Sequence, residues 1–237
     1  MGRKPDIYPH LNLWKNLDGV HRLLEIHTKM SGKKPGYKHN VEVLNKSAIV
    51  LLVACWEAFV EDLAEDAFSI LLRRAKKHTV FSSRVLADAA KSLKDASDPR
   101  DMWKLAGDGW RQVLRSHKTT IFERYTGKLN TPRPHQVDAL YESVLGIKSI
   151  SRTWRWQGMK PQAAVSKLEG LIELSGSIAH RVEASTTVLK NHVRDYVDLV
   201  NRIAVQTSNA VRIEVVSATG KEPWPKFSYK SIFARQP

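Results

Sequence analysis

The sequence contains a single cysteine, Cys55, among its 237 residues. One thiol cannot form an internal disulfide, and it cannot build the cysteine clusters that hold structural zinc. Long hydrophobic runs are also missing, because the apolar run that begins at Ala48 is broken by Glu57, far short of the ~20 residues that span a bilayer. The first residues are polar and lack the apolar core of a signal peptide. We therefore expect no transmembrane segment and a cytoplasmic location.

The common catalytic signatures are absent as well. The sequence has no GxxxxGK[ST] phosphate loop, no GxGxxG, no HExxH and no GxSxG elbow. Its nine histidines show no spacing typical of metal ligands. These absences argue against a kinase, a dehydrogenase or a zinc hydrolase, and we expect neither a cofactor nor a metal.

What the sequence has in excess is positive charge. It contains 38 lysines and arginines against 24 aspartates and glutamates, a formal net charge of +14. A surplus of this size favours polyanionic partners such as RNA, DNA or acidic membrane surfaces, without choosing among them.

Apolar residues recur at steps of three and four over most of the chain, which predicts helices. The strongest pattern covers 41–77 and predicts a central helix, with Glu57, Glu61 and Glu65 as an acidic stripe beside its apolar face. Further helices are expected over 7–30, 83–95, 100–124, 135–145, 161–174 and 185–210, the last capped by Ser185 or Thr186. The alternation over 211–216 indicates a short strand or the frayed end of the last helix.

These patterns predict an all-α bundle of one domain with a short irregular or β-like C-terminal tail. Residues 1–36 would form an N-terminal helix and a basic linker packed on the bundle. Residues 37–210 would form the main helical domain, and 211–237 a basic, loosely held extension.

A short segment between two predicted helices carries the functional signal. It reads Leu174-Ser-Gly-Ser-Ile-Ala-His-Arg181, and its Ala-His step resembles the motif region of HEPN proteins of the RiboL-PSP type. The stretch 51–59 is similar to the second helix of that group, and the segments 130–134 and 154–156 are similar to parts of its members. The resemblance covers roughly residues 40 to 210 and implies a HEPN-like bundle of about five to seven helices.

The resemblance also implies a chemistry. Members of the superfamily cleave RNA without a metal, by setting the ribose 2′-hydroxyl against the adjacent phosphate. His180 would be the acid/base residue, since the imidazole pKa lies near neutrality. An arginine normally precedes that histidine and neutralises charge on the phosphoryl oxygens in the transition state.

This sequence departs from the motif at the arginine, where it has Ser175. Serine cannot supply the positive charge. Arg181 is the adjacent candidate for a substitute cation, and Arg152 or Arg155 would serve if the fold brings them near. Glu57 is either a supporting residue for the His180 region or simply the start of the solvated acidic stripe. If an arginine at position 175 points into the cleft, Ser175→Arg should raise a weak activity.

Other residues are candidates for nucleic-acid binding, each with a plainer alternative. Trp154 beside Arg152 and Arg155 is placed to stack on bases, or it is a packing residue. Arg73 and Arg74 contact phosphate, or they only interact with the dipole at the end of the central helix.

The leading hypothesis is an RNA-directed HEPN-like protein, a metal-independent endoribonuclease of the prokaryotic defence or toxin type with a degenerate motif. The alternative is a catalytically inactive HEPN module that binds RNA or a protein partner. A third reading is an adaptor that uses only its charge on DNA or a membrane surface. The resemblance further implies a homodimer that joins two copies of the 175–181 segment across a two-fold axis.

Overall fold

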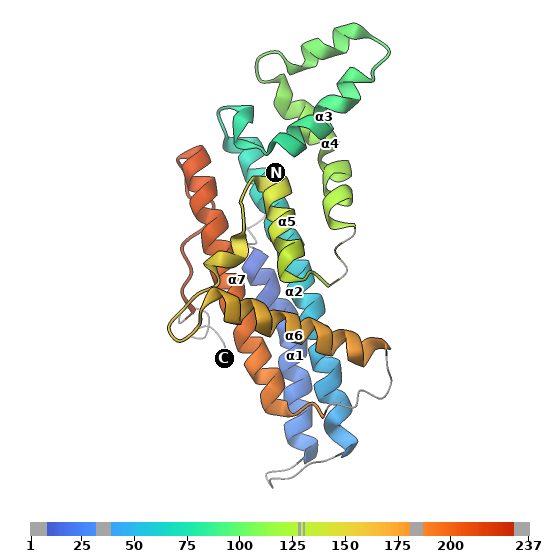
Figure 1. Ribbon diagram of the computed structural model, residues 1–237, viewed down its shortest axis with the longest axis vertical. Coiled ribbons are helices and arrows are strands. Elements are labelled where there is room, and N and C mark those ends of the chain that lie inside the picture. The colour runs from blue at the N-terminus through green and yellow to red at the C-terminus, as the bar shows by residue number, and fades with distance from the viewer. Residues whose placement is uncertain (1–8, 32–38, 128, 130, 181–186, 230–237) are drawn as a thin grey trace, which may run out of the picture.

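A computed structural model describes residues 9–31, 39–127, 129, 131–180 and 187–229 of the chain. Within these ranges the fold is all-α, which confirms the predicted class (Figure 1). The helices are α1 (Pro9–Ser31), α2 (His39–Arg74), α3 (Ser83–Lys94), α4 (Gly109–Thr126), α5 (Pro134–Leu145), α6 (Pro161–His180) and α7 (Lys190–Thr219), with 3-10 turns at His78–Val80, Pro99–Leu105 and Ile150–Thr153.

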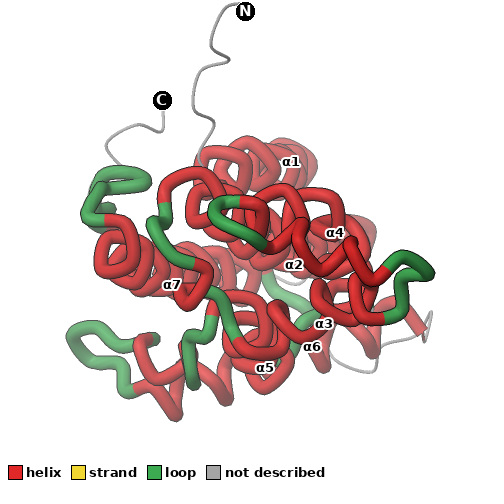
Figure 2. The backbone as a smooth tube through the Cα atoms, turned by 90° about the horizontal axis from the view of Figure 1, so that it is seen from above, coloured by secondary structure: helices red, strands yellow, loops and turns green. Residues whose placement is uncertain are grey.

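The predicted central helix is α2, and the bundle is built around it. It packs on α1, α4, α5, α6 and α7, so that it lies among the other helices when the molecule is seen from above (Figure 2). Trp56, Phe59, Leu63 and Phe68 on this helix are fully buried. By length and composition α2 would be able to cross a membrane, but half of that stretch is buried in the bundle, as in the core helix of a soluble protein.

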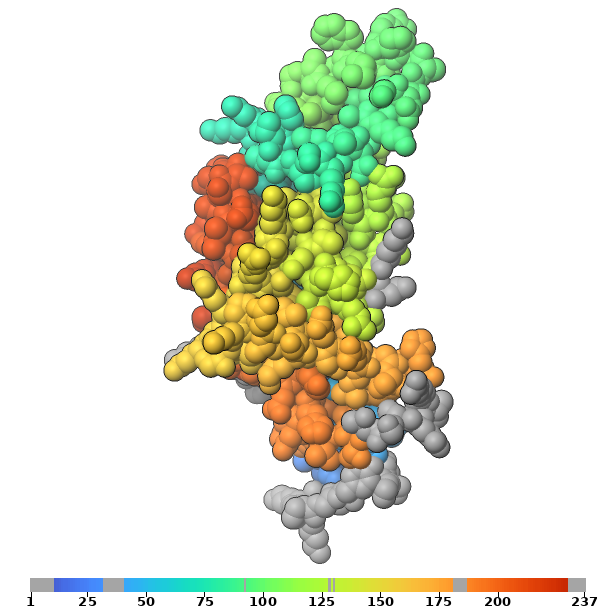
Figure 3. Space-filling model, viewed as in Figure 1, coloured from blue at the N-terminus to red at the C-terminus, as the bar shows by residue number. Residues whose placement is uncertain are grey.

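The other helices are arranged in two groups around α2. Helix α1 lies along its lower half, α7 runs from the bottom of the bundle to its upper left, and α6 crosses the bundle below the start of α5 (Figure 1). The segment from α3 to α4 forms one end of the elongated molecule (Figure 3). That segment was expected to contain one helix over 100–124. It is instead a 3-10 turn followed by α4, because the chain turns at Gly107, whose φ of +58° favours glycine.

Two predicted helix boundaries near the motif segment are wrong. Helix α6 does not end at residue 174 but continues to His180, so the motif segment is helical at least that far. Helix α7 begins at Lys190 with Leu189 as its N-cap residue, so Ser185 and Thr186 do not cap it. These two residues lie outside the described part of the chain.

The C-terminal region also differs from the prediction. Residues 211–216 are not a strand but part of α7, which ends at Thr219 before Gly220 in the left-handed region. The residues that follow are held firmly. Trp224 is 2% exposed, and its indole N–H donates to the Ser208 carbonyl at 3.3 Å. The amide side chain of Asn209 exchanges two hydrogen bonds with the backbone of Phe227. The extension is therefore not loosely held over residues 220–229.

Candidate active site

The site is built on the C-terminal half of α6. Pro161 occupies the first turn, where its missing N–H costs nothing. One side of the helix packs into the core through Ala164, Leu168, Leu171, Ile172 and Ser175. The opposite side faces outward and ends at His180, which is exposed.

Ser175 and His180 lie on different sides of this helix. Each residue of an α-helix is rotated by about 100° from the one before it. Two side chains five positions apart therefore point in directions about 140° apart. Ser175 is 4% exposed, whereas His180 is exposed to solvent. The position of the motif arginine therefore faces the core, and an arginine placed there would not share the outward face with His180.

A different arginine reaches that outward face. Glu173, Ser177 and His180 follow one another at helical spacing on it. Arg133, from the loop before α5, places its Nη1 atom 3.4 Å from the Glu173 carboxylate. Arg133 was not predicted as a site residue. The only sequence signal was its place in the 130–134 segment that is similar to RiboL-PSP members.

Glu57 holds the loop that carries Arg133. Its carboxylate accepts a hydrogen bond from the Thr131 N–H at 3.0 Å. Thr131 has a φ of +55°, a conformation that costs energy for a β-branched residue and needs support from its surroundings. The neighbouring Trp56 indole N–H donates to the Pro132 carbonyl at 3.2 Å. Glu57 thus contacts the loop backbone two residues before Arg133 and does not belong to the solvated stripe alone.

The rest of the acidic stripe is only partly solvated. Burial is the largest cause that raises the pKa of Glu61 and of Asp62, and neighbouring carboxylates add to it. Asp66 continues the stripe, and burial followed by repulsion from Asp62 and Glu65 raises its pKa to about 6. Lys118 forms a 2.6 Å ion pair with Glu65 and offsets part of this repulsion.

The predicted nucleic-acid residues before α6 come from a different segment than His180. Arg152 and Arg155 are exposed and precede α6, whereas His180 is its last residue. Trp154 is fully buried, and its indole N–H donates to the Thr207 hydroxyl at 2.9 Å. Its indole therefore cannot stack on a base, and the base-stacking hypothesis for Trp154 is corrected to a packing role.

The other arginines predicted to bind nucleic acid lie at the end of α2. Arg73 and Arg74 are exposed at the end of α2, sixteen and seventeen residues beyond Glu57. Arg74 donates to the Glu222 carbonyl at 3.1 Å, so it ties α2 to the C-terminal segment. Arg181 lies outside the described residues. Within the described ranges, no group of three or more His, Cys, Asp or Glu side chains is arranged to hold a metal ion.

Comparison with known proteins identifies the family. No curated protein and no solved structure matches the chain. The family model of the RiboL-PSP-HEPN domain matches residues 18–212, which is most of the sequence. That range contains α2, the loop with Arg133 and all of α6. The chain therefore belongs to the RiboL-PSP-HEPN family of HEPN domains.

Proposed function

We propose that this protein acts on RNA as a metal-independent endoribonuclease, with His180 as its acid/base residue and Arg133 as the cation that α6 lacks. The observation that carries the proposal is the Arg133–Glu173 pair on the same outward face of α6 as His180. Family membership supports a nucleic-acid function in general, and the net charge of +14 favours a polyanionic substrate.

The Arg133–Glu173 pair can open when a phosphate arrives. The two side chains are 41% and 66% exposed, and exposed ion pairs of this kind contribute about 0–1 kcal/mol. A phosphodiester offers the guanidinium a bidentate anionic partner that can take the place of the Glu173 carboxylate. A move of about one helical turn, roughly 5.4 Å, brings Arg133 from Glu173 toward the level of Ser177, next to His180.

The chemistry then follows from two groups. The 2′-oxygen bonds to phosphorus as the bond to the 5′-oxygen breaks, which leaves a cyclic phosphate and a 5′-hydroxyl. His180 takes the proton of the 2′-hydroxyl or gives one to the leaving 5′-oxygen, and water carries out the other proton transfer. The guanidinium of Arg133 stabilises the negative charge that develops on the phosphoryl oxygens, which is worth several kcal/mol when the donor is well placed. Glu57 is a positioning residue here, because it fixes the loop that presents Arg133.

Cleavage of single-stranded RNA in the presence of EDTA tests the proposal. His180→Ala should abolish cleavage, and Arg133→Gln should slow it by about 10²–10³-fold. The matched controls are His78→Ala and Arg115→Gln, which remove an exposed histidine and an exposed arginine elsewhere in the molecule. Activity that survives both His180→Ala and Arg133→Gln would rule out this site.

The alternative function is a HEPN module that binds RNA or a protein partner without cleaving it. What favours it is the absence of any arginine within α6 together with the burial of Ser175. RNA binding without cleavage, over diverse substrates, would support this alternative over the endoribonuclease. The cytoplasmic location, the defence or toxin context and the homodimer remain part of the proposal.

A further inference from the structure

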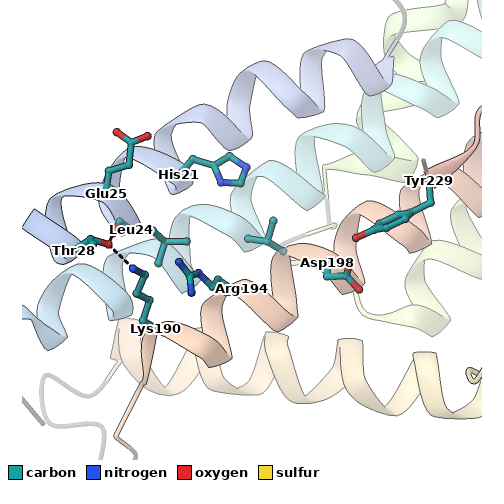
Figure 4. Close-up of a pocket in the computed structure, with 9 residues that line it drawn as sticks. His21, Leu24, Glu25, Thr28, Lys190, Arg194, Asp198 and Tyr229 are labelled. Atoms are coloured by element: carbon teal, nitrogen blue, oxygen red, sulfur yellow. Dashed lines mark hydrogen bonds between the residues drawn. The ribbon is translucent and has the colours of Figure 1, made fainter. Parts of the chain in front are cut away.

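A second concave site lies between α1 and α7. It is a cavity of about 400 Å³ whose walls are His21, Leu24, Glu25 and Thr28 of α1, and Lys190, Arg194, Val197 and Asp198 of α7, with Tyr229 at one end (Figure 4). Its volume lies within the range of small-molecule sites. None of these residues belongs to the α6 face that carries His180.

One end of the cavity carries cations that lack acidic partners. Lys190 and Arg194 are one turn apart on α7, and Lys190 donates a hydrogen bond to the Thr28 hydroxyl (Figure 4). Within the described part of the chain, neither of the two forms an ion pair with a carboxylate. Burial, and then the charge of Arg194, lowers the pKa of Lys190. Glu25 and Asp198 line the same cavity but pair with neither cation, so two cations that repel each other leave a place where a bound anion is stabilised.

The other end of the cavity is flat and rigid. The Arg202 guanidinium lies 3.6 Å from the centroid of the Tyr229 ring, and it also pairs with Asp198 at 2.8 Å. This stacking fixes the Tyr229 ring at the mouth, beside the Asp198 carboxylate (Figure 4). Between the two ends, Leu24 and Val197 provide apolar walls.

We propose that this cavity binds a small phosphomonoester that carries a planar ring. The phosphate lies against Lys190 and Arg194, and the ring lies on the apolar walls toward Tyr229, where Asp198 accepts a hydrogen bond from the ligand. The eight helical steps from Lys190 to Asp198 span about 12 Å of α7, which matches the length of such a molecule from phosphate to ring. The site is independent of the proposed endoribonuclease function, because it shares no residue with that face.

Calorimetric titration of the full chain with three probes tests the proposal. The probes are adenosine 5′-monophosphate, adenosine, which lacks the phosphate, and glycerol 3-phosphate, which lacks the ring. We expect the first to bind more tightly than either of the others. Equal binding of glycerol 3-phosphate and the nucleotide would overturn the assignment of the ring end, and no binding of any probe to folded protein would overturn the site.

Charge variants identify the binding residues. Lys190→Gln combined with Arg194→Gln should weaken nucleotide binding by about 10–100-fold, since the charge-assisted hydrogen bonds from both side chains to the phosphate are lost. The matched control is Lys91→Gln with Lys94→Gln, which removes the same charge from exposed positions on α3. Equal loss in both double variants would mean that only the net charge attracts the probe, and it would overturn the site. Melting curves establish that both variants are folded.

Two further experiments complete the test. The first distinguishes a free nucleotide from the end of an RNA chain as the ligand, and the second distinguishes this cavity from the His180 site. A 5′-phosphorylated oligonucleotide that binds more tightly than the free nucleotide, through Lys190 and Arg194, would identify the ligand as the end of an RNA chain. His180→Ala should abolish cleavage and leave nucleotide binding unchanged. Loss of binding in His180→Ala would show that the probe occupies the α6 site and would overturn the inference.

Discussion

Glu57 on α2 and Thr131 in the loop before α5 are 74 residues apart and are joined by a 3.0 Å hydrogen bond from the Thr131 N–H to the Glu57 carboxylate. The sequence placed Glu57 in an acidic stripe on α2. In the structure its carboxylate binds the backbone of the loop that contains Arg133. It links the central helix to the face of α6 that ends at His180, through the Arg133–Glu173 pair.

Removal of the Glu57 carboxylate should therefore loosen the loop. We expect Glu57→Ala to lower the free energy of unfolding by about 1 kcal/mol, because a solvent-exposed hydrogen bond to a charged group is lost and Thr131 keeps its strained backbone. Glu57→Gln, which keeps an acceptor oxygen, should cost less. Denaturant unfolding measures the loss, and faster hydrogen exchange of the Thr131 amide locates it. Unchanged exchange in Glu57→Ala would contradict the role of Glu57.

Restoring the family arginine at position 175 should not restore activity. Ser175 is 4% exposed on the packed side of α6, so Ser175→Arg forces a guanidinium into the core or displaces the helix. Burying a charge without a partner costs several kcal/mol. We expect a lower midpoint of denaturant unfolding and no gain in RNA cleavage. A faster variant of unchanged stability would show that this side of α6 is reached by substrate.

The acidic stripe predicts a pH dependence of stability. The pKa of Asp66 is raised from 3.8 to about 6, mainly by burial. Because the folded state holds this proton more tightly than the unfolded state, the stabilising contribution is complete below about pH 4 and is lost as the pH rises through 6. Asp66→Asn should thus be more stable than wild type above pH 6, by about 1–3 kcal/mol, and equal to it near pH 4. Thermal unfolding across this range checks the crossover. Equal stability of Asp66→Asn and wild type above pH 6 would contradict the role of this carboxyl group.

The fold could be predicted in large part because its signals are local. The helical period of the apolar residues in α2 and α7 identified both helices, and the proline at 161 marked the start of α6. The end of α7 was left open between a strand and the end of the helix, because the alternating pattern over 211–216 resembles a strand. Contacts of the C-terminal segment, such as Trp224 on Ser208, keep these residues helical, and such contacts cannot be seen in a sequence.

The site was harder to predict because it depends on distant pairs. The motif segment identified His180 as a candidate. Its exposure and the burial of Ser175, however, depend on how α6 is rotated in the bundle. The pairing of Arg133 with Glu173 joins residues 40 positions apart. Trp154 and Arg155 are adjacent in sequence, yet one is buried and the other exposed. Motif resemblance indicates which residues are candidates for the site. It does not indicate which of them are buried or which distant residues they pair with.

Association into a dimer is the next expectation. Val43 and Val50 lie two turns apart on one side of α2 and are 61% and 37% exposed, an apolar side that a self-complementary interface would cover. Light scattering at micromolar concentration should give twice the monomer mass, and Val50→Asp should shift it toward the monomer. A monomeric wild-type mass at all concentrations would count against a composite site made by two copies of α6.

Binding to single-stranded RNA should weaken steeply with salt. The net charge of +14 motivates this, since every phosphate neutralised by a lysine or arginine releases counterions and adds about 0.7 to the slope of log affinity against log salt for single strands. Arg152 and Arg155 are exposed beyond the start of α6, so the double variant Arg152→Gln, Arg155→Gln tests whether the RNA path extends along this helix away from His180. We expect its slope to be smaller by about 1.4 if both contact phosphates, whereas Lys91→Gln with Lys94→Gln on α3 should leave the slope nearly unchanged.

Fluorescence anisotropy with a labelled oligonucleotide at several salt concentrations gives these slopes. Equal slopes for the two double variants would confine the RNA to the His180 end of α6, and undetectable binding at low salt would remove every nucleic-acid function proposed for this chain.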